Sequence, residues 1–116
     1  MTGGKTALKD ILSTIYNIAS DKKASGIIIL DIGKLTSFSD YFFICSAEST
    51  VQVNAIADGI VKSLKEKNIK LWHDEGYKEC NWILLDYGQV IIHIFLEEVR
   101  DFYNLEGLWA DAPRVK

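Results

Sequence analysis

Few side chains in this sequence have the type and spacing that catalysis requires. His73-Asp74-Glu75 sets an imidazole beside two carboxylates, as a metal site or an acid–base pair would. Neighbouring residues of a strand point to opposite faces, however, and no second group of ligands accompanies this triplet. We interpret it as a solvated loop. His93 lies in an apolar stretch with Ile91 and Phe95 on its own face, which predicts a hydrogen-bonded, partly buried side chain.

Other candidate sites lack the motif that would complete them. Gly3-Gly-Lys-Thr6 has neither the earlier glycine nor the preceding strand of a phosphate-binding loop. Cys45 and Cys80 have no second ligand nearby and no nucleophile elbow, which predicts two buried thiols in a reducing compartment. Three scattered carboxylates leave a second hypothesis open, a metal-dependent nucleotidyl- or phosphotransferase, although no Asp-x-Asp pair accompanies them. They are Asp31, Asp40 and Asp86. We predict no catalytic residue, no metal and no cofactor.

The most informative segment is acidic and aromatic. From residue 73 to residue 87 it holds four carboxylates and one lysine, in a chain whose net charge is −3. If Ile83 and Leu85 of a strand face the core, Trp82 faces outward. Asp86 then shares the outer face, and an exposed tryptophan is typical of an interface hot spot. The alternative is that Trp82 belongs to the core.

Composition limits the class of protein. The 116 residues, of which 48% are hydrophobic, predict one globular domain over residues 1–116. A pI near 5.3 argues against direct nucleic-acid binding and suggests a basic macromolecular partner. No apolar run reaches the roughly 18 residues that cross a bilayer, and residues 1–10 lack signal or transit features. We therefore expect a cytoplasmic protein without membrane contact.

Periodicity and turn residues predict the elements that hold these side chains. Helices are expected from about Thr6 to Asp21, from the capping-box pair Ser49 and Gln52 to Asn68, and from Glu97 to Tyr103. The last should turn Val99, Phe102 and Tyr103 inward. Strands are expected at Gly26 to Ile32 in the sheet interior, Tyr41 to Cys45, Ile69 to Trp72 before a polar loop, Asn81 to Asp86 and Val90 to Phe95.

These elements define the expected fold. Gly88 supplies the positive φ of a tight hairpin between the last two strands. The order α-β-β-α-β-β-β-α predicts an α/β or α+β fold, with a mixed sheet of about five strands and covering helices. Such a fold is nucleotidyltransferase-like without the catalytic motif.

Several segments together resemble the ribosomal silencing factor family, also called Iojap-like. They are Ser37 to Cys45, Ala55 to Asp58, Glu75-Gly76, Trp82 to Phe95, Tyr103 to Trp109 and Asp111 to Val115. The resemblance runs from about Ala7 to the end. Cys80-Asn81 and Gln89 depart from the family's pattern, which weakens the expected charge complementarity without removing the aromatic anchors.

The resemblance implies a function. Members of this family bind the bacterial large ribosomal subunit through its ribosomal protein fourteen, a basic protein on the face that meets the small subunit. They thereby block subunit joining and lower translation when nutrients are scarce. The implied partner-binding residues are the anchors Trp82 and Tyr87, the turn residues Asp86 and Gly88, and Glu75 with Gly76. The sequence leaves open whether the free protein forms a homodimer.

Overall fold

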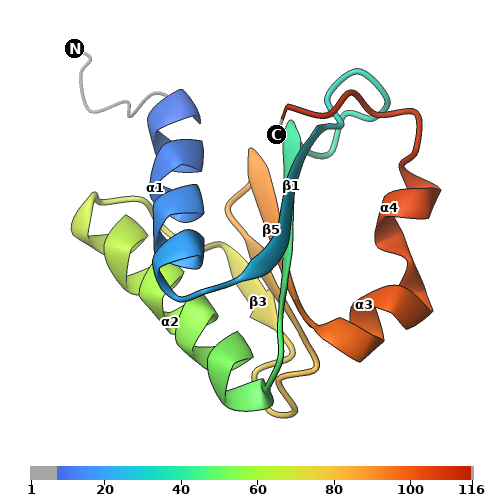
Figure 1. Cartoon of the computed structure of the whole chain (residues 1–116). Helices are drawn as coiled ribbons and strands as arrows, with labels where there is room; N and C mark the ends of the chain where they lie inside the picture. Colours follow the sequence, from blue (N-terminus) through green and yellow to red (C-terminus); the bar gives the residue numbers. More distant parts are fainter. Residues whose placement is uncertain (1–7, 116) are drawn as a thin grey trace.

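The computed structural model describes residues 8–115 and places a five-stranded sheet between two layers of helices (Figure 1). The strands are β1 (Ser25–Asp31), β2 (Tyr41–Ala47), β3 (His73–Glu75), β4 (Trp82–Asp86) and β5 (Val90–Leu96). Their order across the sheet is β1-β2-β5-β4-β3. The central strands β2 and β5 are parallel, and the other neighbours are antiparallel. The expected α+β fold with a mixed sheet is confirmed.

Helices α1 (Leu8–Asp21) and α2 (Thr50–Glu66) cover one face of this sheet. Their apolar stripes pack on the strand residues that point the same way and form the larger core cluster. The expected cap is present, since Ser49 Oγ accepts a hydrogen bond from Gln52 N at 3.1 Å. The side-chain amide of Gln52 also donates hydrogen bonds, from Nε2 to the backbone carbonyls of Lys22 and Lys23. These bonds join the start of α2 to the end of α1. Residues 6 and 7 of the predicted first helix, like the glycine-lysine segment 3–6, lie outside the described residues.

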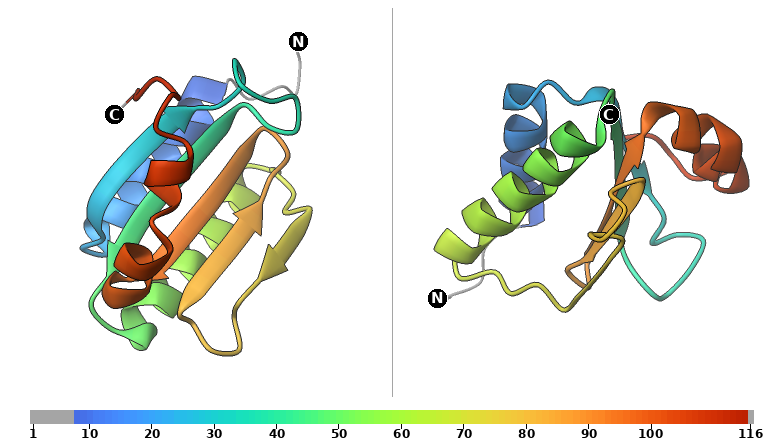
Figure 2. Two further views of the ribbon diagram at one scale, coloured as in Figure 1. Left: turned by 90° about the vertical axis from the view of Figure 1, so that its right-hand side faces the viewer. Right: turned by 90° about the horizontal axis from the view of Figure 1, so that it is seen from below.

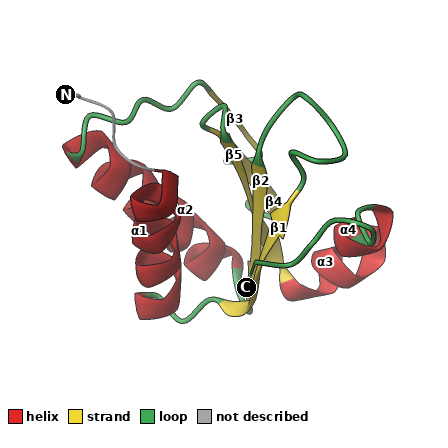
Figure 3. Ribbon diagram, turned by 90° about the horizontal axis from the view of Figure 1, so that it is seen from above, coloured by secondary structure: helices red, strands yellow, loops and turns green. Residues whose placement is uncertain are grey.

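The other face of the sheet is covered in part by α3 (Glu97–Tyr103) and α4 (Leu105–Leu108). In the left view of Figure 2 these helices lie over β1 and β2 and leave β4 and β3 uncovered. Figure 3 shows the resulting three layers from above. Helix α3 has the predicted bounds, and Val99 packs against the smaller core cluster as expected; the inward position is wrong for Phe102, which is 82% exposed, and for Tyr103, which is 52% exposed. Of the two helices, only α4 contributes a buried side chain, Leu105, whereas Tyr103 of α3 touches the sheet through the ring of Trp82 on β4 and stays partly exposed.

Two strand predictions also need correction. The first strand lies at the edge of the sheet, not in its interior. It is nevertheless apolar, because Ile29 faces the α1–α2 side and Ile28 and Leu30 face the other. The third strand lies at His73–Glu75, where we expected a solvated loop, and it pairs with β4. All three of its residues are exposed, because β3 forms the opposite edge of the sheet.

Residues 113–115 continue the sheet beyond β1. Asp31 N donates to Pro113 O at 2.8 Å, and Val115 N donates to Ile29 O at 2.8 Å. These bonds satisfy backbone groups that an edge strand otherwise exposes to water. Across residues 8–115, no helix has both the length and the apolar character needed to cross a membrane.

Candidate functional site

A continuous layer of aromatic rings lies on the face opposite α1 and α2. Ile83 and Leu85 of β4 are fully buried in the larger core, so the alternation of the strand places Trp82 on this opposite face. The Trp82 ring lies 4.7 Å from Phe95 and 5.0 Å from Tyr103, measured between ring centroids. We call the connected set the aromatic layer. Its members are Phe38, Phe42, Trp82, His93, Phe95, Phe102, Tyr103 and Trp109.

The aromatic layer is part core and part surface. Phe42, His93 and Phe95 are buried in its middle. Trp82 is half-buried, and beyond it Tyr103 and Phe102 extend the rings into solvent. Trp82 is therefore neither the free surface anchor nor the core residue that the sequence allowed. It is held by its neighbours in one orientation, which lowers the entropy lost when a partner covers it.

His93 fixes the indole of Trp82 by a hydrogen bond. Trp82 Nε1 donates to His93 Nδ1 at 3.1 Å, which assigns the ring proton of the neutral imidazole to Nε2. Among the described residues, Nε2 has no hydrogen-bond partner. Burial lowers the pKa of His93 from 6.5 to about 4. The predicted hydrogen-bonded histidine is confirmed, and its acceptor role requires the neutral form.

This burial predicts a loss of stability in acid. Unfolded His93 takes up a proton near pH 6.5, whereas folded His93 does so only near pH 4. The stability from neutral His93 is therefore complete above pH 6.5 and is lost as pH falls towards 4. We expect its share of the free energy of unfolding to drop by about 2 kcal/mol between pH 7 and pH 5. Urea unfolding of the wild type and of His93→Asn at both pH values tests this prediction. The free energy of unfolding should fall more in the wild type than in the variant, and the difference is the contribution of His93. An equal fall in the two proteins would contradict the prediction.

The β4–β5 hairpin has the predicted turn, but it divides the two expected anchors between the faces of the sheet. Gly88 has φ +83°, and its N–H donates to Asp86 Oδ1 at 2.8 Å. Tyr87, however, is 8% exposed and packs in the larger core, while Trp82 belongs to the opposite face. Burial raises the pKa of Tyr87 to about 12. The expectation of an exposed Tyr87 beside Trp82 is wrong, because the turn directs this ring to the face of the sheet that α1 and α2 cover.

Trp72 is a surface residue at this turn that our sequence reasoning did not single out. Its side chain is among the exposed large hydrophobics, at 72%. A Cβ on Gly88 would lie 2.8 Å from its ring, so a side chain at position 88 would displace the ring of Trp72, and the φ of +83° is what favours glycine. The available signal was a tryptophan directly before the acidic segment.

Glu75-Gly76 lies next to the backbone of Trp82. Gly76 has φ +93°, and a Cβ there would lie 2.0 Å from the Trp82 carbonyl oxygen. Only glycine allows this approach of two backbone segments. Glu75 is exposed, and its Oε2 lies 2.9 Å from His73 Nε2. The structure thus brings Glu75, Gly76 and Trp82 together, although the sequence supplied no geometric reason for it.

The remaining candidate groups do not converge. A Cβ on Gly33 would lie 3.4 Å from Asp40 Oδ1 and 3.6 Å from Asp31 Oδ1, so these two carboxylates share one end of the sheet. Asp86 lies on β4, which β5 separates from β2. Residues 8–115 contain no group of three or more side chains placed to hold a metal. Cys45 is buried, as expected, and burial raises its pKa to about 12. Cys80 is half-buried.

These features define a class: an α+β domain whose mixed sheet is covered by two helices on one face and carries an aromatic layer on the other. The family model described as "Ribosomal silencing factor during starvation" matches residues 5–116. The chain belongs to this family.

Curated relatives and a solved structure agree with this assignment. The chain is 41% identical to the ribosomal silencing factor of Bacillus subtilis, over 90% of this chain and 89% of the relative. It is 38% identical to that of Halalkalibacterium halodurans, over 93% and 92%. A crystal structure of a protein from Chromobacterium violaceum matches with a TM-score of 0.87 at 33% identity, over 90% of this chain and 88% of that one. The names of the curated relatives describe regulators, not enzymes.

Proposed function

We propose that this protein binds the large ribosomal subunit in the cytoplasm, through the basic ribosomal protein fourteen, and sterically blocks joining of the small subunit. Translation would then fall under nutrient limitation. The family description, which names silencing and starvation, supports the regulatory role. The observation that carries the binding surface is the accessible end of the aromatic layer at Trp82, which lies within the acidic segment of residues 73–87.

Apolar burial and charge have separate roles in this proposal. Covering Trp82 and its exposed neighbours removes apolar area from water, at about 25 cal/mol per Å². The carboxylates of residues 73–87 attract a basic partner and orient it during encounter, while contributing less to the final affinity. Tyr87 is buried on the opposite face of the sheet, where it stabilises the hairpin. We therefore assign the role of second aromatic anchor beside Trp82 to Tyr103.

This role requires no turnover. A protein bound on the intersubunit face excludes the small subunit by occupying its space. Asp86 and Gly88 would then have a structural role, because they shape the hairpin turn at the binding surface. Glu75 and Gly76 would contribute by placing the adjoining loop. Because the charge of the chain is negative, we expect direct contact with ribosomal RNA to be small.

Order of addition tests the blocking step. Purified protein added to large subunits before small subunits should lower the amount of joined ribosome, measured by light scattering. Protein added after joining should have a much smaller effect, because the intersubunit face is then covered. Sedimentation of the protein with isolated large subunits, and not with isolated small subunits, is the accompanying binding measurement. Equal inhibition in both orders, or binding to small subunits alone, would contradict the proposal.

A further inference from the structure

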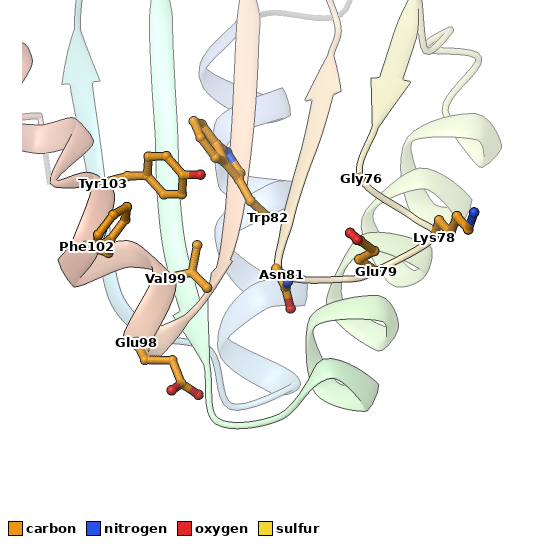
Figure 4. A pocket seen from close by; sticks show the side chains of 9 residues that line it. All are labelled: Gly76, Lys78, Glu79, Asn81, Trp82, Glu98, Val99, Phe102 and Tyr103. Atoms are coloured by element: carbon orange, nitrogen blue, oxygen red, sulfur yellow. The ribbon is translucent and has the colours of Figure 1, made fainter.

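A surface hollow of about 840 Å³ opens beside Trp82, between the β3–β4 loop and α3 (Figure 4). Its aromatic wall consists of Trp82, Tyr103 and Phe102. Tyr103 contacts both of its neighbours, with ring centroids 5.0 Å from Trp82 and 5.2 Å from Phe102. Because Phe102 is 82% exposed and Tyr103 is 52% exposed, much of this wall is in contact with water. The apolar ring faces of Phe102 and Tyr103 are therefore accessible to a partner.

Two carboxylates stand on opposite rims of the hollow. Glu79 comes from the β3–β4 loop and Glu98 from α3, and both are exposed. In Figure 4 the Glu98 side chain points away from the three rings, so Glu98 acts on the hollow from its outer rim. The ion pairs found within residues 8–115 involve neither of them. Lys78 also lines the hollow, but in Figure 4 its side chain points away from Trp82. The lining of the hollow therefore carries two carboxylates against one ammonium, and that ammonium is directed away from Trp82.

Aromatic faces combined with unpaired carboxylates are the chemistry that recognises a guanidinium group. This group is planar and always charged, stacks on aromatic rings, and donates paired hydrogen bonds to carboxylates. An apolar side chain would bury the carboxylates without compensation. A lysine ammonium would attract the same charges but lacks the planar face that stacks.

We propose that this hollow binds an arginine side chain of the partner. Trp82 and Tyr103 would supply the stacking surface, and Glu79 and Glu98 the charge. The identity of the partner rests on the function proposed above, whereas the preference for arginine rests on the hollow alone. This proposal adds four specificity residues that neither the family resemblance nor the acidic segment identifies as one group. They are Phe102, Tyr103, Glu79 and Glu98.

A titration of the full chain tests the hollow without the ribosome. N-acetyl-arginine amide and its neutral isostere N-acetyl-citrulline amide are compared at equal ionic strength, with the NMR signals of the Trp82 indole N–H and the Tyr103 ring as readout. We expect arginine to shift these signals about two- to fivefold more than citrulline at the same concentration. The difference should disappear in Glu79→Gln/Glu98→Gln. Equal shifts from both probes would overturn the proposal.

Binding to large subunits tests the same residues in the assembly. Tyr103→Leu should weaken binding about tenfold, and Tyr103→Phe, which retains the ring face, should restore most of that loss. Glu79→Gln/Glu98→Gln should weaken binding about fivefold, whereas Glu48→Gln/Glu66→Gln, the same charge change on the α2 side, should not. Urea unfolding confirms that each variant is folded.

The two experiments separate the two proposals. If wild type binds large subunits and all these variants bind equally well, the arginine site is wrong and the proposed function stands. If the arginine probe binds selectively but wild type does not bind large subunits, the proposed function is wrong and the hollow stands.

Discussion

Replacing Trp82 with alanine is expected to weaken binding to large ribosomal subunits by about 100-fold. A central tryptophan at an interface contributes on the order of 2–4 kcal/mol, and each 1.4 kcal/mol changes affinity tenfold. The substitution removes the ring that joins the buried part of the aromatic layer to Tyr103. It therefore removes contact area and also frees the rings around it. Co-sedimentation at several protein concentrations measures the change.

A folded variant is the condition for interpreting this loss. Trp82→Ala also breaks the hydrogen bond to His93 and opens a gap beside Phe95, which should cost about 2 kcal/mol of stability. Circular dichroism and urea unfolding show whether the variant remains native under the binding conditions. Val51→Ala, which shortens a 78% exposed side chain on α2, is the control for loss of surface apolar area and should bind normally. A native Trp82→Ala protein that binds as tightly as wild type means that the proposed surface is wrong.

Gly76→Ala is expected to lower the free energy of unfolding by about 3 kcal/mol or more. A Cβ at this position would lie 2.0 Å from the Trp82 carbonyl oxygen, and φ is +93°. Both atoms in this clash are close to the backbone, so no rotamer change relieves it. The loop must move away from β4, and the short pairing of β3 with β4 should weaken with it. Urea unfolding measures the loss, and hydrogen exchange of the β3 and β4 amides locates it.

Gly107→Ala is the matched control for Gly76→Ala. Its added Cβ would lie 2.4 Å from Asn104 Nδ2, the end of a side chain that can rotate away. A change within about 0.5 kcal/mol is expected, because alanine also favours the helix. If both substitutions cost the same, the close approach at Gly76 is not a constraint. A stable Gly76→Ala protein that fails to bind would instead assign Gly76 directly to the partner surface.

The elements that the sequence predicts well are those specified by neighbours along the chain. Ser49 and Gln52 form a cap because they are three residues apart, and Gly88 occupies its turn because few other residues adopt its φ. Apolar periodicity locates α1, α2, β4 and β5 within a few residues. In β4 the same alternation correctly identifies Ile83 and Leu85 as core residues. These features involve residues a turn or a strand apart, so no knowledge of the packing is required.

By itself, the sequence determined the class of fold, the main helices and the hairpin, and it set Trp82 on the other side of β4 from Ile83 and Leu85, while leaving open whether Trp82 is exposed or buried. Only the tertiary structure decided how the aromatic residues divide. It placed Tyr87 beneath the sheet, although this residue adjoins the same strand, and it brought Tyr103 beside Trp82 from a helix far along the chain. The reason is physical. Periodicity along the sequence predicts which side chains lie on the same face of a helix or strand, whereas the packing of the elements decides which other residues that face contacts. The proposed acidic, aromatic site therefore remains centred on Trp82, but the ring beside Trp82 comes from α3.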